Sequence, residues 1–178
     1  MALTVGVNSY VDLVYALAYA EERDGTEGWI SLTPEEQEKT LVSATDGIDT
    51  LIFVGQAADP TQELCWPRNA TYWDPKVGNS VTISNETPEE VKKAQVEWAI
   101  DIGVNGGFAG ADTGSSGGIP PDSISVGSIS LSGLSPDSST YTVGKIAIPP
   151  IVMNLIDHLL LSNVSPNGGV GKPFWRAW

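Results

Sequence analysis

The side chains that could act in nucleophilic catalysis are few and poorly placed for it. His158 is the single histidine and lies in the apolar run LIDHLLL, where a histidine packed along a helix is the ordinary interpretation. Cys65 is the single cysteine, and the chain has no second histidine that could activate it. A small apolar residue beside Trp66 is the better interpretation of Cys65. Nucleophilic catalysis is therefore not predicted.

Carboxylates are plentiful, but helix starts explain most of their clustering. They gather where negative charge complements the helix dipole, at Glu35, Glu36 and Glu38 and again at Glu89 and Glu90. Asp46 and Asp49 fit a solvated helix face, although a glycosidase-type carboxylate pair stays open because only its separation in space defines it. Residues 168–173, GGVGKP, lack the spacing and the hydroxyl of a phosphate loop. We predict no catalytic residue, no cofactor, no metal site and no enzymatic activity.

The stretch QELCWPRNATYW at residues 62–73 crowds aromatic side chains around a Pro-Arg pair. Trp66 precedes a proline, which favours an extended backbone at Trp66. Pro67 blocks continuation of a helix, and Arg68 carries five N–H donors that can hold carbonyl or carboxylate oxygens. We predict a structural corner at Trp66, Pro67 and Arg68, with Trp66 filling the gap between two helices. A contact between subunits is the alternative.

A second aromatic group ends the chain. A glycine-rich, polar stem precedes four residues that we predict to contact a partner or a neighbouring subunit: Phe174, Trp175, Arg176 and Trp178. Large aromatic side chains on a polar segment have few neighbours along the chain to pack against, and such groups often fill a pocket on a partner. A disordered terminus is the alternative.

The composition supports one domain of ordinary size and limits its partners. The chain has 178 residues, 41% of them hydrophobic, and carries 22 acidic against 9 basic residues, a net charge of −13. Such a surface repels phosphate, because nucleic-acid affinity comes largely from Lys and Arg releasing counterions. Tight non-specific DNA binding is disfavoured, whereas DNA passing close by is not. We expect neither a signal peptide nor a membrane span.

Start signals predict four helices. The expected N-cap of the first is Ser9, and the motifs Thr33-Pro34-Glu35-Glu36 and Thr87-Pro88-Glu89-Glu90 each predict a cap, a proline at the first position and a capping box. Pro149-Pro150 opens a fourth, apolar helix over residues 151–161. Apolar residues at helical spacing follow every one of these signals.

The remaining segments predict loops and a little β-structure. Residues 56–86 form a long connector, in which Val81 to Ile83 suggest a short strand, and alternation over residues 123–148 predicts a two-stranded β-ribbon. The predicted fold class is mainly α, a small helical bundle of about four helices with a short β-hairpin, extended loops and a C-terminal arm. Residues 1–161 form a single domain with a glycine-rich insertion at 103–121, and residues 162–178 form the arm.

Several motifs, in their order, resemble a known family. They are the early Ser-Tyr helix, Ala44-Thr45 with Ile48-Asp49, the segment from Gln62 to Arg68, and the helix from Pro88 to Ala94. This order resembles the small head–tail connector proteins of tailed bacteriophages, also called adaptor or head-completion proteins. Relatives of these proteins are often labelled DnaT-like single-stranded-DNA-binding proteins. The glycine-rich insertion and the aromatic arm depart from the family pattern.

The resemblance implies a structural virion protein without enzymatic activity. It implies a homo-oligomeric ring of about twelve subunits between the portal protein and the neck, tail-terminator or tail proteins. Double-stranded DNA would pass through its channel without specific binding, no membrane would be involved, and assembly would take place in the host cytoplasm.

Two other functions stay open. A single-stranded-DNA-binding or replication accessory protein could stack bases on Trp66, Tyr72 and Trp73, although no basic groove is evident. An enzyme that uses clustered carboxylates is supported only by the abundance of Asp and Glu.

Overall fold

The computed structural model describes residues 2–106, 123–126, 129–132, 141–143 and 146–161. These residues contain five α-helices, a short 3-10 helix and seven strands. The helices are α1 (Leu13–Glu21), α2 (Glu27–Ile30), α3 (Pro34–Asp49), α4 (Glu89–Asn105) and α5 (Pro150–Ile156), with η1 at Asp157–Leu159. The strands are β1 (Gln56–Ala57), β2 (Arg68–Asp74), β3 (Asn79–Glu86), β4 (Ser123–Val126), β5 (Ile129–Ser132), β6 (Tyr141–Val143) and β7 (Ile146–Ile148).

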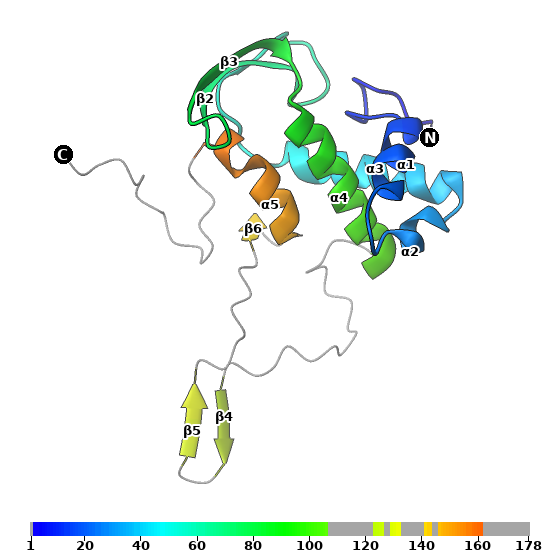
Figure 1. Ribbon diagram of the computed structural model, residues 1–178, viewed down its shortest axis with the longest axis vertical. Helices are drawn as coiled ribbons and strands as arrows, with labels where there is room; N and C mark the ends of the chain where they lie inside the picture. Colours follow the sequence, from blue (N-terminus) through cyan, green and yellow to red (C-terminus); the bar gives the residue numbers. More distant parts are fainter. Residues whose placement is uncertain (1, 107–122, 127–128, 133–140, 144–145, 162–178) are drawn as a thin grey trace, which may run out of the picture.

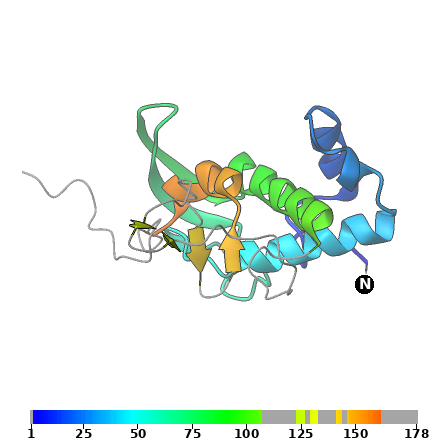
Figure 2. The same cartoon turned by 90° about the horizontal axis from the view of Figure 1, so that it is seen from below.

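Helix α4 is the centre of the core. It packs between α3 and α5 (Figure 1) and buries side chains around most of its circumference, among them Val91, Gln95 and Trp98. Its buried residues therefore do not form a single stripe along the helix, because other elements pack against several of its sides. The β2–β3 hairpin lies at the end of the helices opposite to α1 and α2 (Figure 2). The prediction of a small, mainly helical domain is confirmed in this outline.

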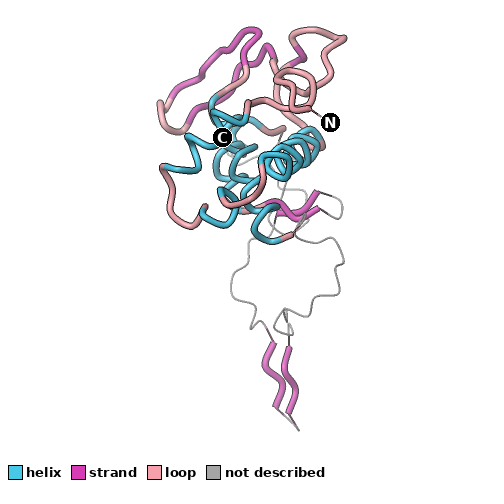
Figure 3. Tube along the Cα trace, turned by 90° about the vertical axis from the view of Figure 1, so that its right-hand side faces the viewer, coloured by secondary structure: helices cyan, strands magenta, loops and turns pink. Residues whose placement is uncertain are grey.

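The connector at residues 56–86 contains more structure than one short strand. It folds into an antiparallel sheet in the order β1-β2-β3, which Figure 3 shows at one end of the helices. The β2–β3 pairing shifts register between Arg68 and Ala70, opposite Asn85, which has a positive φ of 52°. Such a bulge bends the hairpin and redirects the side chains beside it.

The expected single ribbon over residues 123–148 is two separate hairpins. Strand β4 pairs with β5, from Ser123 opposite Ser132 to Val126 opposite Ile129. Strand β6 pairs with β7, from Tyr141 opposite Ile148 to Val143 opposite Ile146. Each strand therefore pairs with its immediate neighbour in sequence, which requires closing a much shorter loop than the expected long-range pairing. Most of the glycine-rich insertion at 103–121 and the whole arm at 162–178 lie outside the described residues.

Of the three threonine or serine caps, the structure confirms one. Thr33 accepts from the backbone N–H of Glu36 and Glu36 closes the capping box. Helix α1 instead begins after Asp12, because the Ser9 hydroxyl is buried and bonds the Val11 carbonyl. Helix α4 begins after Pro88 without a side-chain cap, so the expected role of Thr87 is also wrong.

This contrast gives a matched pair of variants. Thr33→Ala should lower the free energy of unfolding by about 1 kcal/mol, the usual cost of a lost N-cap. Thr87→Ala should leave it nearly unchanged, because Thr87 makes no cap hydrogen bond. Urea denaturation of both variants measures the difference, and an equal loss in the two would contradict this account of the caps.

The described helices include none that combines the length and the apolar character needed to cross a membrane.

Candidate functional site

The structure places Trp66, Pro67 and Arg68 at a turn between the helical core and the sheet. The Trp66–Pro67 peptide bond is cis. Trp66 is 1% exposed and meets the ring of Phe53 edge to face at 5.3 Å between centroids. Arg68 donates to the carbonyls of Val54 (2.9 Å), Gly55 (2.8 Å) and Cys65 (3.2 Å). Through these hydrogen bonds, Arg68, the first residue of β2, holds the segment Val54-Gly55 that precedes β1.

A small polar cluster supports the same corner from the helical side. The Tyr10 hydroxyl donates to Asp49, which also accepts from the Cys65 backbone N–H at 3.2 Å. Burial raises the pKa of Tyr10, of Asp49 and of the Cys65 thiol. A thiol with a raised pKa is a poor nucleophile at neutral pH. Cys65 therefore acts as a packed side chain of the corner and not as a nucleophile. Trp66 is too deeply buried to stack on a base.

The sheet presents one face without ionisable side chains. We call it the outer face, and its residues are Gln56, Asn69, Thr71, Trp73, Ser80, Thr82 and Ser84. They share one side because they alternate along each strand and pair across the strands. Trp73 is 59% exposed at the end of this face near the hairpin tip, opposite Ser80. In a chain of net charge −13, this face therefore combines a large exposed aromatic ring with neutral polar side chains.

The opposite, inner face of the hairpin contacts the helical body. Ala70 is buried, and the ring of Tyr72 lies 5.4 Å from that of His158 on η1. Burial is the main cause that raises the pKa of Tyr72, and the negative charges of Glu90, Asp74 and Glu86 raise it further. The carboxylates of Glu90, Asp74 and Glu86 are thus close enough to Tyr72 to act on its hydroxyl.

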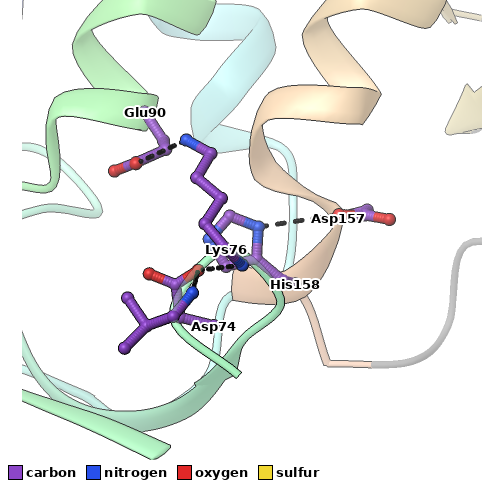
Figure 4. A network of polar contacts seen from close by, with 6 residues as sticks. Asp74, Lys76, Glu90, Asp157 and His158 are labelled. Carbon is purple, nitrogen blue, oxygen red and sulfur yellow. Dashed lines mark hydrogen bonds and ion pairs between the residues drawn. The ribbon is translucent and has the colours of Figure 1, made fainter. Parts of the chain in front are cut away.

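The hairpin tip is tied to the body by polar contacts (Figure 4). Lys76 Nζ lies 3.1 Å from a Glu90 carboxylate oxygen on α4, and Asp74 accepts from the Lys76 backbone N–H at 2.8 Å. His158 Nδ1 lies 3.6 Å from Asp157. Of these contacts, only the Lys76–Glu90 pair joins the hairpin tip to the helical body, and an ion pair with so exposed a lysine contributes little stability.

A groove of about 430 Å³ lies at the bulged end of the hairpin. Four of its lining residues belong to the outer face, and the others complete its floor and rim: Asn69, Thr71, Thr82 and Ser84, then Gly55, Ala70 and Ile83. A side chain at Gly55 would collide with the Asn69 carbonyl, since a Cβ there would lie 2.2 Å from that oxygen. Glycine at this position keeps the rim of the groove intact.

Basic side chains are scarce in the part of the chain that the structure describes. They are Arg23, Lys39, Arg68, Lys76, Lys92 and Lys93. Arg23, Lys76 and Lys92 pair with carboxylates, and Arg68 is occupied by carbonyls. No continuous basic groove exists among residues 2–106 and 148–161, so phosphate neutralisation cannot dominate binding at this surface.

The other candidates from the sequence are distributed as follows. His158 is mostly buried, with a side chain 12% exposed, beside Tyr72 on the inner side of the hairpin. Glu36 belongs to the capping box of α3 and Glu89 pairs with Lys92. Among the described residues, no three His, Cys, Asp or Glu side chains are grouped so as to hold a metal ion. Phe174, Trp175, Arg176 and Trp178 lie outside the described residues.

Comparison with known proteins identifies the family. A family model described as "Putative DnaT-like ssDNA binding protein" matches residues 2–171, nearly the whole chain. The chain belongs to this family. No curated protein and no solved structure shows a significant match to it.

Membership in the DnaT-like family corrects the resemblance drawn from the motifs. The matching family is not a head–tail connector family, so the connector identification is wrong, together with the virion and portal-binding roles that it implied. The motifs misled because they specify packing. Ala44, Thr45 and Ile48 are buried core positions of α3, and Trp66 is buried at the corner. Such residues define a fold, whereas partners are chosen by exposed residues. Self-association of the chain stays a prediction.

The outer face is the part of the site that the sequence analysis missed. Apolar residues occur at every second position, at Ala70 and Tyr72 and again at Val81 and Ile83, and the turn between them contains Pro75 and Gly78. This pattern is a hairpin signal. That alternation places Trp73 on the face opposite to Tyr72. Tyr72 and Trp73 therefore do not form one stacking platform, although they are adjacent in sequence.

Proposed function

We propose that the protein binds single-stranded DNA on the outer face of the β2–β3 hairpin, as an accessory DNA-binding protein without enzymatic activity. The observation that carries the proposal is the exposed Trp73 on a face without carboxylates, in a chain of the DnaT-like family. The bases, not the phosphates, are the groups that this face contacts.

Stacking favours unpaired bases. Stacking of one base on an aromatic side chain contributes about 1–3 kcal/mol to the binding free energy. In a duplex, the base would first have to unstack from its neighbouring bases. Trp73 stands on the rigid strand β2 and is exposed enough for a base to cover its indole. Neutral hydroxyls and amides on both sides of it offer hydrogen bonds to bases and sugars. Duplex DNA offers no free base face to this surface.

The variant that tests the proposal is Trp73→Ala. Losing one stacked base should weaken binding of a labelled 15-nucleotide single strand by a factor of about 10 or more. Trp73→Phe should recover much of the affinity, because phenylalanine keeps an aromatic face. Fluorescence anisotropy at low salt gives the dissociation constants.

Val14→Ala provides the matched control. Val14 is 77% exposed on α1, at the end of the helical body away from the hairpin, and its substitution should leave the affinity unchanged. Equal affinities for wild type and Trp73→Ala would overturn the proposed surface. Equal affinities for single-stranded and duplex DNA would overturn the proposed mode.

The salt dependence separates this mode from phosphate binding. On single strands, log K falls with log [salt] at a slope of about −0.7 per neutralised phosphate. The β2–β3 hairpin has two basic residues, Arg68, which is held by backbone carbonyls, and Lys76, which is paired with Glu90. We therefore expect a slope no steeper than about −1. A slope several times steeper would place the contact on another, basic part of the chain.

A further inference from the structure

The groove at the bulged end of the hairpin has a polar side chain that is held in one orientation. Asn69 Oδ1 accepts two hydrogen bonds, from the Ser84 hydroxyl at 3.1 Å and from the Asn85 backbone N–H at 2.9 Å. The backbone N–H of Asn85 can only donate, so reversing the amide would lose that bond and place two donors against each other. The NH₂ end is therefore the end left free.

That NH₂ group has no protein partner among the described residues. Asn69 lines the groove and is exposed, so its two N–H donors are available to a ligand. The bulge explains why the residue is so placed, because the shift of register between Arg68 and Ala70 occurs at Asn69. Asn85, with its positive φ, supplies the backbone donor that holds the carbonyl end.

The rest of the groove combines one hydroxyl pair with apolar surface. Thr71 and Thr82 share a hydrogen bond of 3.0 Å across the strands, so one of the two hydroxyl protons is used and the other is free. The methyl groups of the two threonines supply the apolar part of the lining, because the side chains of Ala70 and Ile83 point to the inner face of the hairpin. The groove thus offers an excess of donors beside a patch that suits a methyl group.

We propose that this groove is a nucleobase subsite that prefers thymine, next to the stacking position on Trp73. This inference rests on the proposed single-stranded-DNA binding and adds a base preference to it. Thymine presents carbonyl oxygens that accept from an amide NH₂, and its 5-methyl group can pack on the methyl groups of Thr71 and Thr82. Adenine pairs with an asparagine amide through two bonds only when Oδ1 accepts from the adenine amino group, and here Oδ1 already accepts from Ser84 and Asn85, so adenine can use only a ring nitrogen. Thr71 and Trp73 lie two residues apart on the same face of β2, about 7 Å, so neighbouring bases can occupy both positions.

The test compares oligonucleotides on variants of one residue. The ratio of the dissociation constants for dA15 and dT15 is measured for wild type, Asn69→Asp and Asn69→Ala. Asn69→Asp keeps an oxygen that accepts from Ser84 and Asn85, replaces the NH₂ donors by a second acceptor oxygen and adds a negative charge. A flexible dT strand binds many proteins better than dA for reasons unrelated to base recognition. The change in the ratio on substitution is therefore the readout.

We expect the dA15:dT15 ratio to fall about fivefold in both Asn69 variants, the size of one net hydrogen bond. Asn79→Asp is the control for charge, because Asn79 is exposed at the other end of the hairpin and lies outside the groove. It should weaken both strands alike and leave the ratio unchanged. In wild type, dU15 should bind about twofold more weakly than dT15, since it lacks the methyl group.

The outcomes separate the two proposals. A ratio unchanged in both Asn69 variants, with binding still dependent on Trp73, would overturn the thymine subsite and leave single-stranded-DNA binding intact. Equal binding of dU15 and dT15 by wild type would overturn the methyl contact. Failure of wild type to bind any of the three strands would overturn the proposed function, and the subsite with it.

Discussion

Replacing Gln95 by leucine should lower the free energy of unfolding by about 3 kcal/mol, because a buried polar network would lose its centre. Gln95 is completely buried on α4. Its Nε2 donates to Ser9 Oγ (2.7 Å), Thr45 Oγ1 (2.8 Å) and the Leu41 carbonyl (3.0 Å). Leucine has a similar volume, so the loss reports hydrogen bonding more than a cavity.

The largest part of this loss comes from the N-terminal segment. Gln95 Oε1 accepts from the Tyr10 backbone N–H at 3.0 Å, and in the leucine variant that donor would be buried without a partner. An orphaned buried N–H costs about 1–3 kcal/mol, and each lost hydrogen bond adds about 1 kcal/mol. The segment before α1 should consequently detach first, which hydrogen exchange at Tyr10 and Val11 would detect.

Gln62→Leu is the matched control for this substitution. Gln62 lies in the loop before the corner, where it bonds the Leu64 carbonyl and the Asp59 N–H near the surface. Its loss should cost less than about 1 kcal/mol, because water replaces both partners. Urea denaturation compares the two variants. A Gln95→Leu protein as stable as the control would show that the network does not hold the N-terminal segment.

Replacing Arg68 by lysine should lower the free energy of unfolding by about 2 kcal/mol, although the charge is kept. The guanidinium donates to carbonyls that diverge from one another, on Val54, Gly55 and Cys65. An ammonium group on a flexible stem cannot reach all of them at once. The carbonyls left without the donor lie in the partly buried turn between α3 and β2.

Arg23→Lys controls for the general difference between the two side chains. Arg23 pairs with Glu97 at 2.7 Å, with side chains 40% and 10% exposed, and the Tyr19 hydroxyl also donates to Glu97. A lysine keeps the charge and needs to reach only this one carboxylate, so the variant should lose less than about 1 kcal/mol. Thermal denaturation of both variants measures the difference. Equal losses at Arg23 and Arg68 would contradict the role of Arg68 as a clamp on carbonyls.

The elements that the sequence predicts best are those whose signals are local. Thr33 and Glu36 form their capping box within one helical turn, so the pattern alone locates the start of α3. Ser9 carries the same kind of signal, but Gln95, 86 residues further on, engages its hydroxyl and the helix begins at Leu13 instead. A contact at that separation leaves no trace in a local pattern.

The site was harder to predict than the helices for a related reason. Trp73 and Asn69 become candidates only when the strands are paired, because the pairing decides which side chains share a face. The register shift at Asn69 is set by Asn85 on the other strand. The motifs that resembled a connector family consist of residues that pack α3, α4 and the corner. Buried residues of this kind are compatible with several functions, so the motifs did not identify the function.

The irregularity at Asn69 and Asn85 has a second consequence, for the solubility of the protein. Strand β3 forms an outer edge of its sheet, with exposed backbone groups that a strand from another molecule could extend. The kink at Asn85 interrupts this edge, and Glu86 follows it with a negative charge. Bulges and charges are the usual protection against edge-to-edge aggregation. A repair of the hairpin to a regular register would therefore favour fibrous association of a chain that is otherwise kept apart by its charge.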